Sequence, residues 1–332
     1  MKCFFIFVAI FMKTAILWGE ACHAESPKRE ALSLGVAENA GNILTFIALE
    51  QGFYRDEGLE VTTRSWPAGK MALEAMLRNE IEVATVADTP IVLQSFQRSD
   101  FVIIATFSHN NPYRLVTDRK GGIVAPTDLR GHRVGVMTGT TAQFFLHSIL
   151  ADLGIASSEI TEVNLPAAES SEALAQNRVD AVAAFDPYGY YAQVALGDRA
   201  IIIPYEKGRH EETFNYATRR DFSQKRPVAA QCLLRATQRA IEWSRNHRHE
   251  AVAVVARRLK MDEKILETLW GNSRHALSLD QVLIVSLESQ ARWAIRNGIG
   301  NVDRKATIPN YLDFLDTSPL DAVMPSAVTI IR

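Results

Sequence analysis

The hydrophobic and polar positions of this chain form one pattern that occurs twice, starting at residue 34 and again at residue 134. Each copy opens with a short apolar strand and continues through a polar loop into an amphipathic helix that ends at Asn79 or Asn177. A second apolar strand follows and stops at an Asp close to a Pro, in Asp88-Thr89-Pro90 and in Asp186-Pro187. The repeat predicts two similar α/β units.

The remaining pattern completes these units and adds helices after them. In the first unit we expect strands at residues 31–37, 59–63, 81–86 and 101–105, and helices at 42–53, at 70–78 and from Pro90. This alternation is typical of βαβ units and favours largely parallel sheets. After Pro227 the pattern predicts helices at 247–259, 262–270 and 279–297, and a tail at 311–326 that is mostly loop.

The predicted fold class is therefore α/β, with two lobes, which suits a chain of 332 residues. Strands at 113–117 and 214–218 would carry the chain into the second lobe and back, as a double-strand hinge. The expected boundaries are 25–112 for the first lobe, 113–215 for the second, and 216–332 for the return part and the carboxyl-terminal helices. Ligands of open α/β sheets bind at strand carboxyl ends, so facing lobes predict a cleft around one small molecule.

Composition and the amino terminus narrow the class of protein. Lys2 precedes a long apolar run, and small residues lead up to Ala24, so we expect residues 1–24 to be a secretory signal peptide; an uncleaved anchor is the alternative. The formal net charge of −2 gives no reason to expect a nucleic-acid partner. Cleavage would leave Cys232 as the only cysteine, which excludes an internal disulfide.

The candidate anion site is the loop Thr138-Gly139-Thr140-Thr141, which lies between a strand and a helix in the second unit. A helix amino terminus offers unpaired N–H groups and a partial positive charge, which suits a sulfonate, carboxylate or phosphate. Capping of the helix by Thr138 or Thr140 explains the same residues equally well. The spacing matches no nucleotide-binding loop.

The first unit offers Asn39 and Asn42 at the equivalent place, and capping explains either one. Asp88 and Asp186 each precede a helix, where capping again suffices. The functional alternative is that one carboxylate meets an ammonium or N–H group of the ligand, and Asp186 is favoured for this role. Trp66, Phe185 and Tyr188 could form a cleft wall or belong to the core. His247 and His249 have the wrong spacing for one helical face, so we expect no metal and no cofactor.

Several segments together resemble a known family. The segments are Gly52-Phe53-Tyr54, Glu57 to Val61, Val86 to Pro90, Asp128 to Val136 with Gly139-Thr140, and Phe185-Asp186-Pro187-Tyr188. In order and spacing they are similar to the solute-binding proteins of nitrate, sulfonate and taurine importers. The likeness extends over nearly the whole chain after the signal segment.

The resemblance implies a type II periplasmic-binding fold, capture of a small solute by lobe closure, and delivery to an ABC permease and its ATPase in the inner membrane. The protein would be periplasmic, monomeric and not an enzyme. The ligand-facing residues carried over are Asn39, Ala40 and Gly41, Asp88 and Thr89, Thr138, Gly139, Thr140 and Thr141, and Asp186. Ala87 and Phe185 depart from the common pattern, where Gly and Trp are frequent, which leaves the solute open.

The leading hypothesis is a binding protein for an alkanesulfonate or a taurine-like zwitterion. Related binders take bicarbonate, pyrimidines or aromatic acids. The alternative from another class is an enzyme similar to the pyrimidine synthases of thiamine biosynthesis. Those enzymes carry a cysteine-rich iron-binding motif, whereas this chain would retain one cysteine. A receptor domain that signals is a third possibility.

Overall fold

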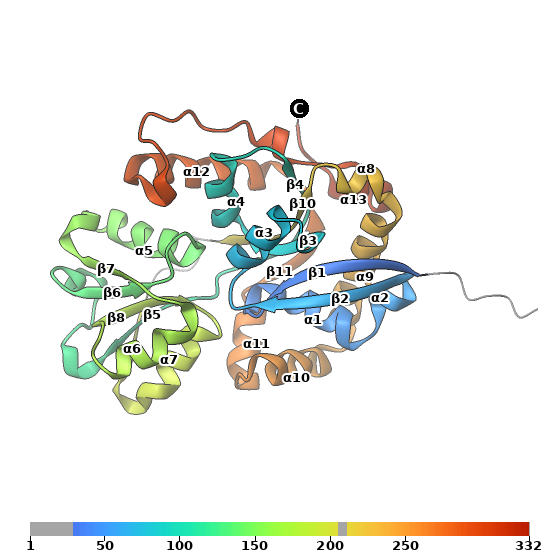
Figure 1. The fold of residues 1–332 in the computed structure, drawn as a ribbon. Helices are drawn as coiled ribbons and strands as arrows, with labels where there is room; N and C mark the ends of the chain where they lie inside the picture. The colour runs from blue at the N-terminus through green and yellow to red at the C-terminus, as the bar shows by residue number, and fades with distance from the viewer. Residues whose placement is uncertain (1–28, 205–210, 332) are drawn as a thin grey trace, which may run out of the picture.

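The computed structural model describes residues 29–204 and 211–331, so the predicted signal peptide lies outside the described residues. The chain forms two lobes, each built on one β-sheet with helices packed around it (Figure 1). The sheet of the first lobe has the strand order β11-β4-β10-β3-β1-β2, and that of the second lobe has the order β7-β6-β8-β5-β9. One large hydrophobic core accompanies the first sheet, and the second sheet has a separate core on each of its faces. The predicted fold class is confirmed.

The repeated sequence pattern corresponds to repeated structure. In each lobe three parallel strands have the same order: β2-β1-β3 in the first and β7-β6-β8 in the second. Their bounds are Glu30–Ala37 (β1), Leu59–Trp66 (β2), Val83–Ala87 (β3), Arg133–Val136 (β6), Thr161–Asn164 (β7) and Ala181–Phe185 (β8). Asn79 and Asn177 both adopt a left-handed conformation, with φ of 64° and 56°, and end the helix before the third strand. Asn tolerates this conformation better than other non-glycine residues.

A glycine occupies the middle of the central strand in both lobes for the same steric reason. A Cβ atom on Gly35 would lie 2.3 Å from Ile81 Cδ1, and one on Gly135 would lie 2.5 Å from Leu165 Cδ1. Large apolar side chains therefore pack directly against the backbone at these two positions.

The expectation of largely parallel sheets is wrong for the strands that follow the three parallel ones in each sheet. In the first sheet β10 (Glu212–Arg219) pairs antiparallel with β3 and with β4 (Phe101–Asn110), and β11 (Arg274–Ser278) pairs antiparallel with β4. In the second sheet β5 (Tyr113–Asp118) pairs antiparallel with β8 and with β9 (Ala200–Ile203). These strands flank the chain's passages between the lobes, which run from β4 to β5 and from β9 to β10. The whole of β10 lies in the first sheet, whereas the expected boundary at residue 215 divides it.

Helices cover both sheets, and the carboxyl-terminal ones belong to the first lobe (Figure 1). Their bounds are Ile43–Glu50 (α1), Phe53–Asp56 (α2), Gly69–Leu77 (α3), Asp88–Ser95 (α4), Thr141–Asp152 (α5), Ser170–Ala175 (α6), Tyr188–Leu196 (α7), Phe222–Lys225 (α8), Pro227–Asn246 (α9), Arg248–Leu259 (α10), Glu263–Gly271 (α11), Gln281–Asn297 (α12) and Ser318–Val323 (α13). The tail expected as loop thus contains α13. No described helix is long and apolar enough to span a bilayer.

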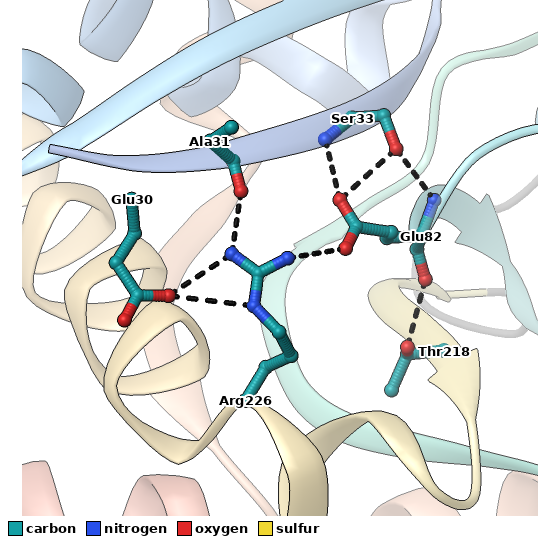
Figure 2. Close-up of polar contacts among 6 residues, drawn as sticks. All are labelled: Glu30, Ala31, Ser33, Glu82, Thr218 and Arg226. Atoms are coloured by element: carbon teal, nitrogen blue, oxygen red, sulfur yellow. Dashed lines mark hydrogen bonds and ion pairs between the residues drawn. The ribbon is translucent and has the colours of Figure 1, made fainter.

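The amino ends of the parallel strands in the first lobe are joined by one arginine (Figure 2). Arg226 donates to Glu30 Oε2 at 2.9 Å, to Glu82 Oε1 at 2.5 Å and to the Ala31 carbonyl at 2.5 Å. The other oxygen of the Glu82 carboxylate accepts from the backbone N–H and hydroxyl of Ser33. One guanidinium therefore ties α9 to both β1 and the start of β3, at the end of the sheet away from the strand carboxyl ends.

We predict that Arg226→Met lowers the free energy of unfolding by about 1–2 kcal/mol, because it breaks several charge-assisted hydrogen bonds that are only partly exposed. The matched control is Arg257→Met, since Arg257 makes one ion pair with Glu50 and its side chain is 67% exposed. Urea denaturation of both variants measures the difference. Equal, small losses would show that the Arg226 network adds nothing beyond an ordinary surface pair.

Candidate functional site

The strand carboxyl ends of the two lobes face each other across a small cavity of about 20 Å³. Both lobes and the passages between them contribute to its wall. The lining residues are Asn39, Ala68, Gly69, Lys70, Ala87, Pro90, Pro112, Tyr113, Thr140, Thr141, Phe185, Glu212 and Phe214. This is the place at which open α/β sheets bind ligands.

Hydrogen bonds across the cleft hold the lobes in a closed arrangement. Lys70 Nζ donates to the Thr138 carbonyl at 3.1 Å. The backbone N–H of Ala40 donates to the Asp186 carbonyl at 3.1 Å. Farther from the cavity, the hydroxyl of Tyr191 on α7 donates to the carbonyl at the end of α10. The cavity is therefore bounded by direct contacts between lobes as well as by side chains.

The predicted anion loop places the start of α5 at the cavity. Thr140 is the residue before the helix, but its hydroxyl donates to the Met137 carbonyl at 2.7 Å and caps no helical N–H group. The hydroxyl of Thr138 donates to Asn164 Oδ1 at 2.9 Å, away from the helix. Capping thus fails to account for these threonines. The Gln143 N–H donates to the Thr140 carbonyl at 3.0 Å, so the N–H groups of Thr141 and Ala142 are the first-turn donors of α5 that an acceptor in the cavity could use.

A second helix, which was not predicted to form part of the site, also begins at the cavity. α3 starts at Gly69 without a side-chain cap. A Cβ atom on Gly69 would lie 2.8 Å from the Thr85 carbonyl oxygen, so only glycine lets the helix start so close to β3. Lys70 follows and lines the cavity. The positive charge of Lys70 is unfavourable at a helix amino terminus. This mismatch is the sequence signal that could have identified Lys70 as a residue of the site.

The first-lobe loop satisfies its own backbone groups. Asn39 Oδ1 accepts from the Gly41 N–H at 3.1 Å, which confirms that Asn39 caps the helix that follows, although its side chain also lines the cavity. Asn42 donates to the Ala37 carbonyl and to Thr85. Ala40 and Gly41 are buried and are not among the lining residues. This loop contributes shape and one amide group to the site.

Asp186, the residue favoured for an ammonium group, has its carboxylate occupied within the protein. Arg114 Nε lies 2.8 Å and 2.9 Å from its two oxygens, and the Tyr190 N–H donates at 2.9 Å. Complete burial raises the pKa of this carboxyl, and the hydrogen bond from Arg114 lowers it part of the way back. Asp186 is not among the lining residues, while its neighbour Phe185 is. The structure thus assigns Asp186 to pairing and helix capping.

Asp88 is completely buried directly beside the cavity and accepts four hydrogen bonds. Its Oδ1 accepts from the Thr89 N–H at 2.9 Å and from the Thr141 hydroxyl at 3.2 Å. Its Oδ2 accepts from the Thr213 N–H at 3.2 Å and from the Ser286 hydroxyl at 3.3 Å. Burial raises the pKa of Asp88 and these donors lower it. Because Thr141 belongs to the second lobe, this carboxylate also bridges the cleft.

The remaining predicted residues lie at the edge of the site or behind it. The hydroxyl of Thr89 donates to Gln290 on α12 and is buried. Gly139, with φ of 71°, lies with Thr138 in an adjacent outer pocket. Trp66 and Tyr188 pack against the cores of their lobes.

Glu212 is an acidic lining residue that the sequence did not reveal. The expected strand began at residue 214, so the residue was not placed in the sheet. Glu212 is 5% exposed, and the hydroxyl of Tyr113 donates to its Oε2. Burial and the nearby charge of Asp88 raise the pKa of Glu212 to about 8. Tyr113 in turn stacks on Phe145, with ring centroids 5.1 Å apart.

Known proteins share this architecture. A Bacillus subtilis (strain 168) protein named "Putative aliphatic sulfonates-binding protein" is 20% identical over 314 residues, which cover 93% of each chain. The periplasmic aliphatic sulphonate binding protein SsuA from Escherichia coli has a TM-score of 0.71 at 19% identity, over 86% of this chain and 97% of that one. SsuA from Xanthomonas axonopodis pv. citri, bound to MOPS, has a TM-score of 0.72 at 18% identity, over 92% and 99%.

These two structures confirm the predicted periplasmic-binding-protein fold. The family model described as NMT1/THI5 like matches residues 39–251, which is more than half of the sequence. The chain belongs to the NMT1/THI5-like family.

Proposed function

We propose that this chain is the extracytoplasmic solute-binding protein of an ABC importer, and that it captures a small anionic or zwitterionic organic solute between its lobes. The observation that carries the proposal is the cavity between the lobes at which two helices begin without a side-chain cap. The relatives described above are binding proteins by name, which favours capture over catalysis. Delivery to a permease and its ATPase, in the periplasm, follows from the same relationship.

The anionic end of the solute would bind the starts of α3 and α5 together with Lys70. Two helix amino termini supply N–H donors and partial positive charge, and the ammonium adds a full charge in a half-buried position. Thr140 and Thr141 frame this end of the cavity, and Asn39 adds a neutral amide. A sulfonate, with three acceptor oxygens, suits several donors that converge from different elements.

Closure accounts for the strength of such contacts. The lobes exclude water from the cavity, and an electrostatic contact gains strength as the effective dielectric constant falls. A solute that touches both lobes stabilises the closed form relative to an open one, as a population shift requires. A permease could distinguish the solute-bound protein from the empty one by this difference between the closed and open forms.

We predict that one small organic anion or zwitterion raises the melting temperature of the protein. A ligand present at a hundred times its dissociation constant adds about 2.7 kcal/mol to the free energy of unfolding. A thermal-shift screen of alkanesulfonates, taurine, nitrate, bicarbonate, aromatic acids and pyrimidines measures this directly. The absence of any shift across the panel would contradict the proposed function.

We predict that Lys70→Met weakens binding of the identified anion by about tenfold, because Lys70 is the one lysine among the lining residues that the structure describes. The matched control is Lys264→Met, since Lys264 is exposed on α11 and is not a lining residue. Isothermal titration calorimetry compares the two variants with the wild type. An equal effect of both substitutions would assign the loss to net charge and not to the cavity.

A further inference from the structure

Two helices from different lobes contact each other outside the cavity. α12 belongs to the first lobe, because Leu283, Leu287 and Ala291 on one of its faces pack in the core of that lobe. α5 belongs to the second lobe, where Phe145 and Ile149 pack in the core. Figure 1 shows α12 above α5. Each helix is fixed to its own lobe by one face, and a second face of each meets the other helix.

The contact on α12 follows one side of the helix. Ser286, Gln290 and Trp293 are spaced by four and three residues, which places them on the same side. Ser286 donates to Asp88 Oδ2, and Gln290 accepts from the Thr89 hydroxyl, both at the start of α4. This side of α12 therefore starts beside the cavity at Asp88 and reaches Trp293 about two turns later.

The facing positions of α5 follow the same course. Thr141 in its first turn donates to the other oxygen of Asp88, and Phe144 and His147 come three and six residues later. The ring centroid of Trp293 lies 5.1 Å from that of Phe144, with an interplanar angle of 73°, and 5.7 Å from that of His147, with an angle of 81°. Aromatic rings favour such edge-to-face arrangements. None of the three rings lines the cavity.

The aromatic contact is largely shielded from water. Trp293 is 8% exposed and belongs to a small hydrophobic cluster with Leu93, Ala294 and Val302, against which Phe144 of the second lobe packs. A groove of about 460 Å³, lined by both α5 and α12, adjoins Trp293. Water from this groove can take the place of the contact when the two helices separate. The apolar area that the contact removes from water therefore favours the closed arrangement.

Two nitrogen atoms limit the strength of the contact. Trp293 Nε1 and His147 Nδ1 are buried and have no hydrogen-bonding partner among residues 29–204 and 211–331. His147 Nε2 lies 2.7 Å from Glu162 Oε2, which holds the imidazole ring from its other side. An unpaired buried polar group is costly, and water can satisfy both nitrogens once the lobes open. Desolvation thus offsets part of the gain from aromatic burial, which keeps the contact reversible.

We propose that Trp293 is a positioning residue for solute capture that does not touch the solute: its contact with Phe144 and His147 stabilises the closed form. The effect on capture rests on the proposed function, whereas the effect on closure is a property of the protein alone. The apparent affinity for a solute held by the closed form rises with the population of that form. A residue that acts through closure therefore changes the affinity for every captured solute by the same factor.

Distances between the lobes of the solute-free protein test the proposal. Spin labels at Thr63→Cys on β2 and at Gln176→Cys after α6, both exposed positions, report opening by double electron–electron resonance in a Cys232→Ala background. We expect a closed population when Trp293 is present. Trp293→Leu should lower the ratio of closed to open molecules by about threefold to tenfold, which is the range that an aromatic pair contributes.

Three further variants separate the contact from a general loss of packing. Phe144→Leu removes the partner ring from the other lobe and should cause a similar loss, and the double variant should lose little more than either single one, because both break one contact. Trp293→Phe keeps a ring and removes the unpaired N–H, so it should retain the closed population. The matched control Trp243→Leu should leave the ratio unchanged, since Trp243 stacks on His247 within the first lobe, with centroids 4.9 Å apart.

The proposal is overturned if Trp293→Leu leaves the ratio unchanged, or if Trp243→Leu lowers it equally. A larger closed population in Trp293→Leu would show that the contact favours the open form, and a parent protein without any closed population would also contradict the proposal. Phe144→Leu decides the question from the second lobe should Trp293→Leu fail to fold.

These measurements use no solute, so the two proposals fail separately. A thermal-shift screen without any ligand would contradict the proposed function and leave the role of Trp293 in closure standing. For the ligands that the screen identifies, Trp293→Leu should weaken binding of each by the same factor, measured by calorimetry. Factors that differ from one ligand to another would show that Trp293 contacts the solute, which contradicts its proposed role.

Discussion

The buried carboxylate of Asp88 is the contact on which the closed molecule depends. It accepts hydrogen bonds from the start of α4, from β10, from α12 and from Thr141 in the other lobe. A buried charge is tolerated when its oxygens are fully hydrogen-bonded, and this one satisfies that condition only when the lobes meet. Opening the cleft removes the Thr141 donor and admits water in its place. Closure of the lobes and the hydrogen bonding of the Asp88 carboxylate are therefore coupled.

The electrostatic arrangement of the cavity follows from the repeat. Each α/β unit directs the starts of its helices toward the strand carboxyl ends, so facing units bring positive helix termini together. Lys70 strengthens this tendency, and Glu212 opposes it from the hinge side. A site with helix termini alone would accept any small anion of suitable size. Glu212, from β10, adds an acidic group to the same wall of the cavity.

The sequence predicts the repeated units well because their constraints are local. The left-handed Asn79 and Asn177 and the crowded Gly35 and Gly135 depend on backbone conformation and near neighbours, which a pattern reflects. The site depends on distant partners. Asp186 looked available until Arg114, 72 residues earlier, was found against it. The importance of Glu212 depends on Tyr113 from the opposite passage between lobes.

The contacts across the cleft also limit how much free energy a solute must contribute to stabilise the closed form. Lys70, Ala40, Thr141 and Tyr191 each donate one hydrogen bond from one lobe to the other. Each is worth about 1 kcal/mol net, since water replaces the lost partner when the lobes separate. Together, these four hydrogen bonds can offset the entropy that is lost when the lobes no longer move relative to each other. They are weak enough that closure stays reversible. A solute that accepts hydrogen bonds at the helix starts of both lobes contributes a comparable amount, and contributes it only when both lobes surround it.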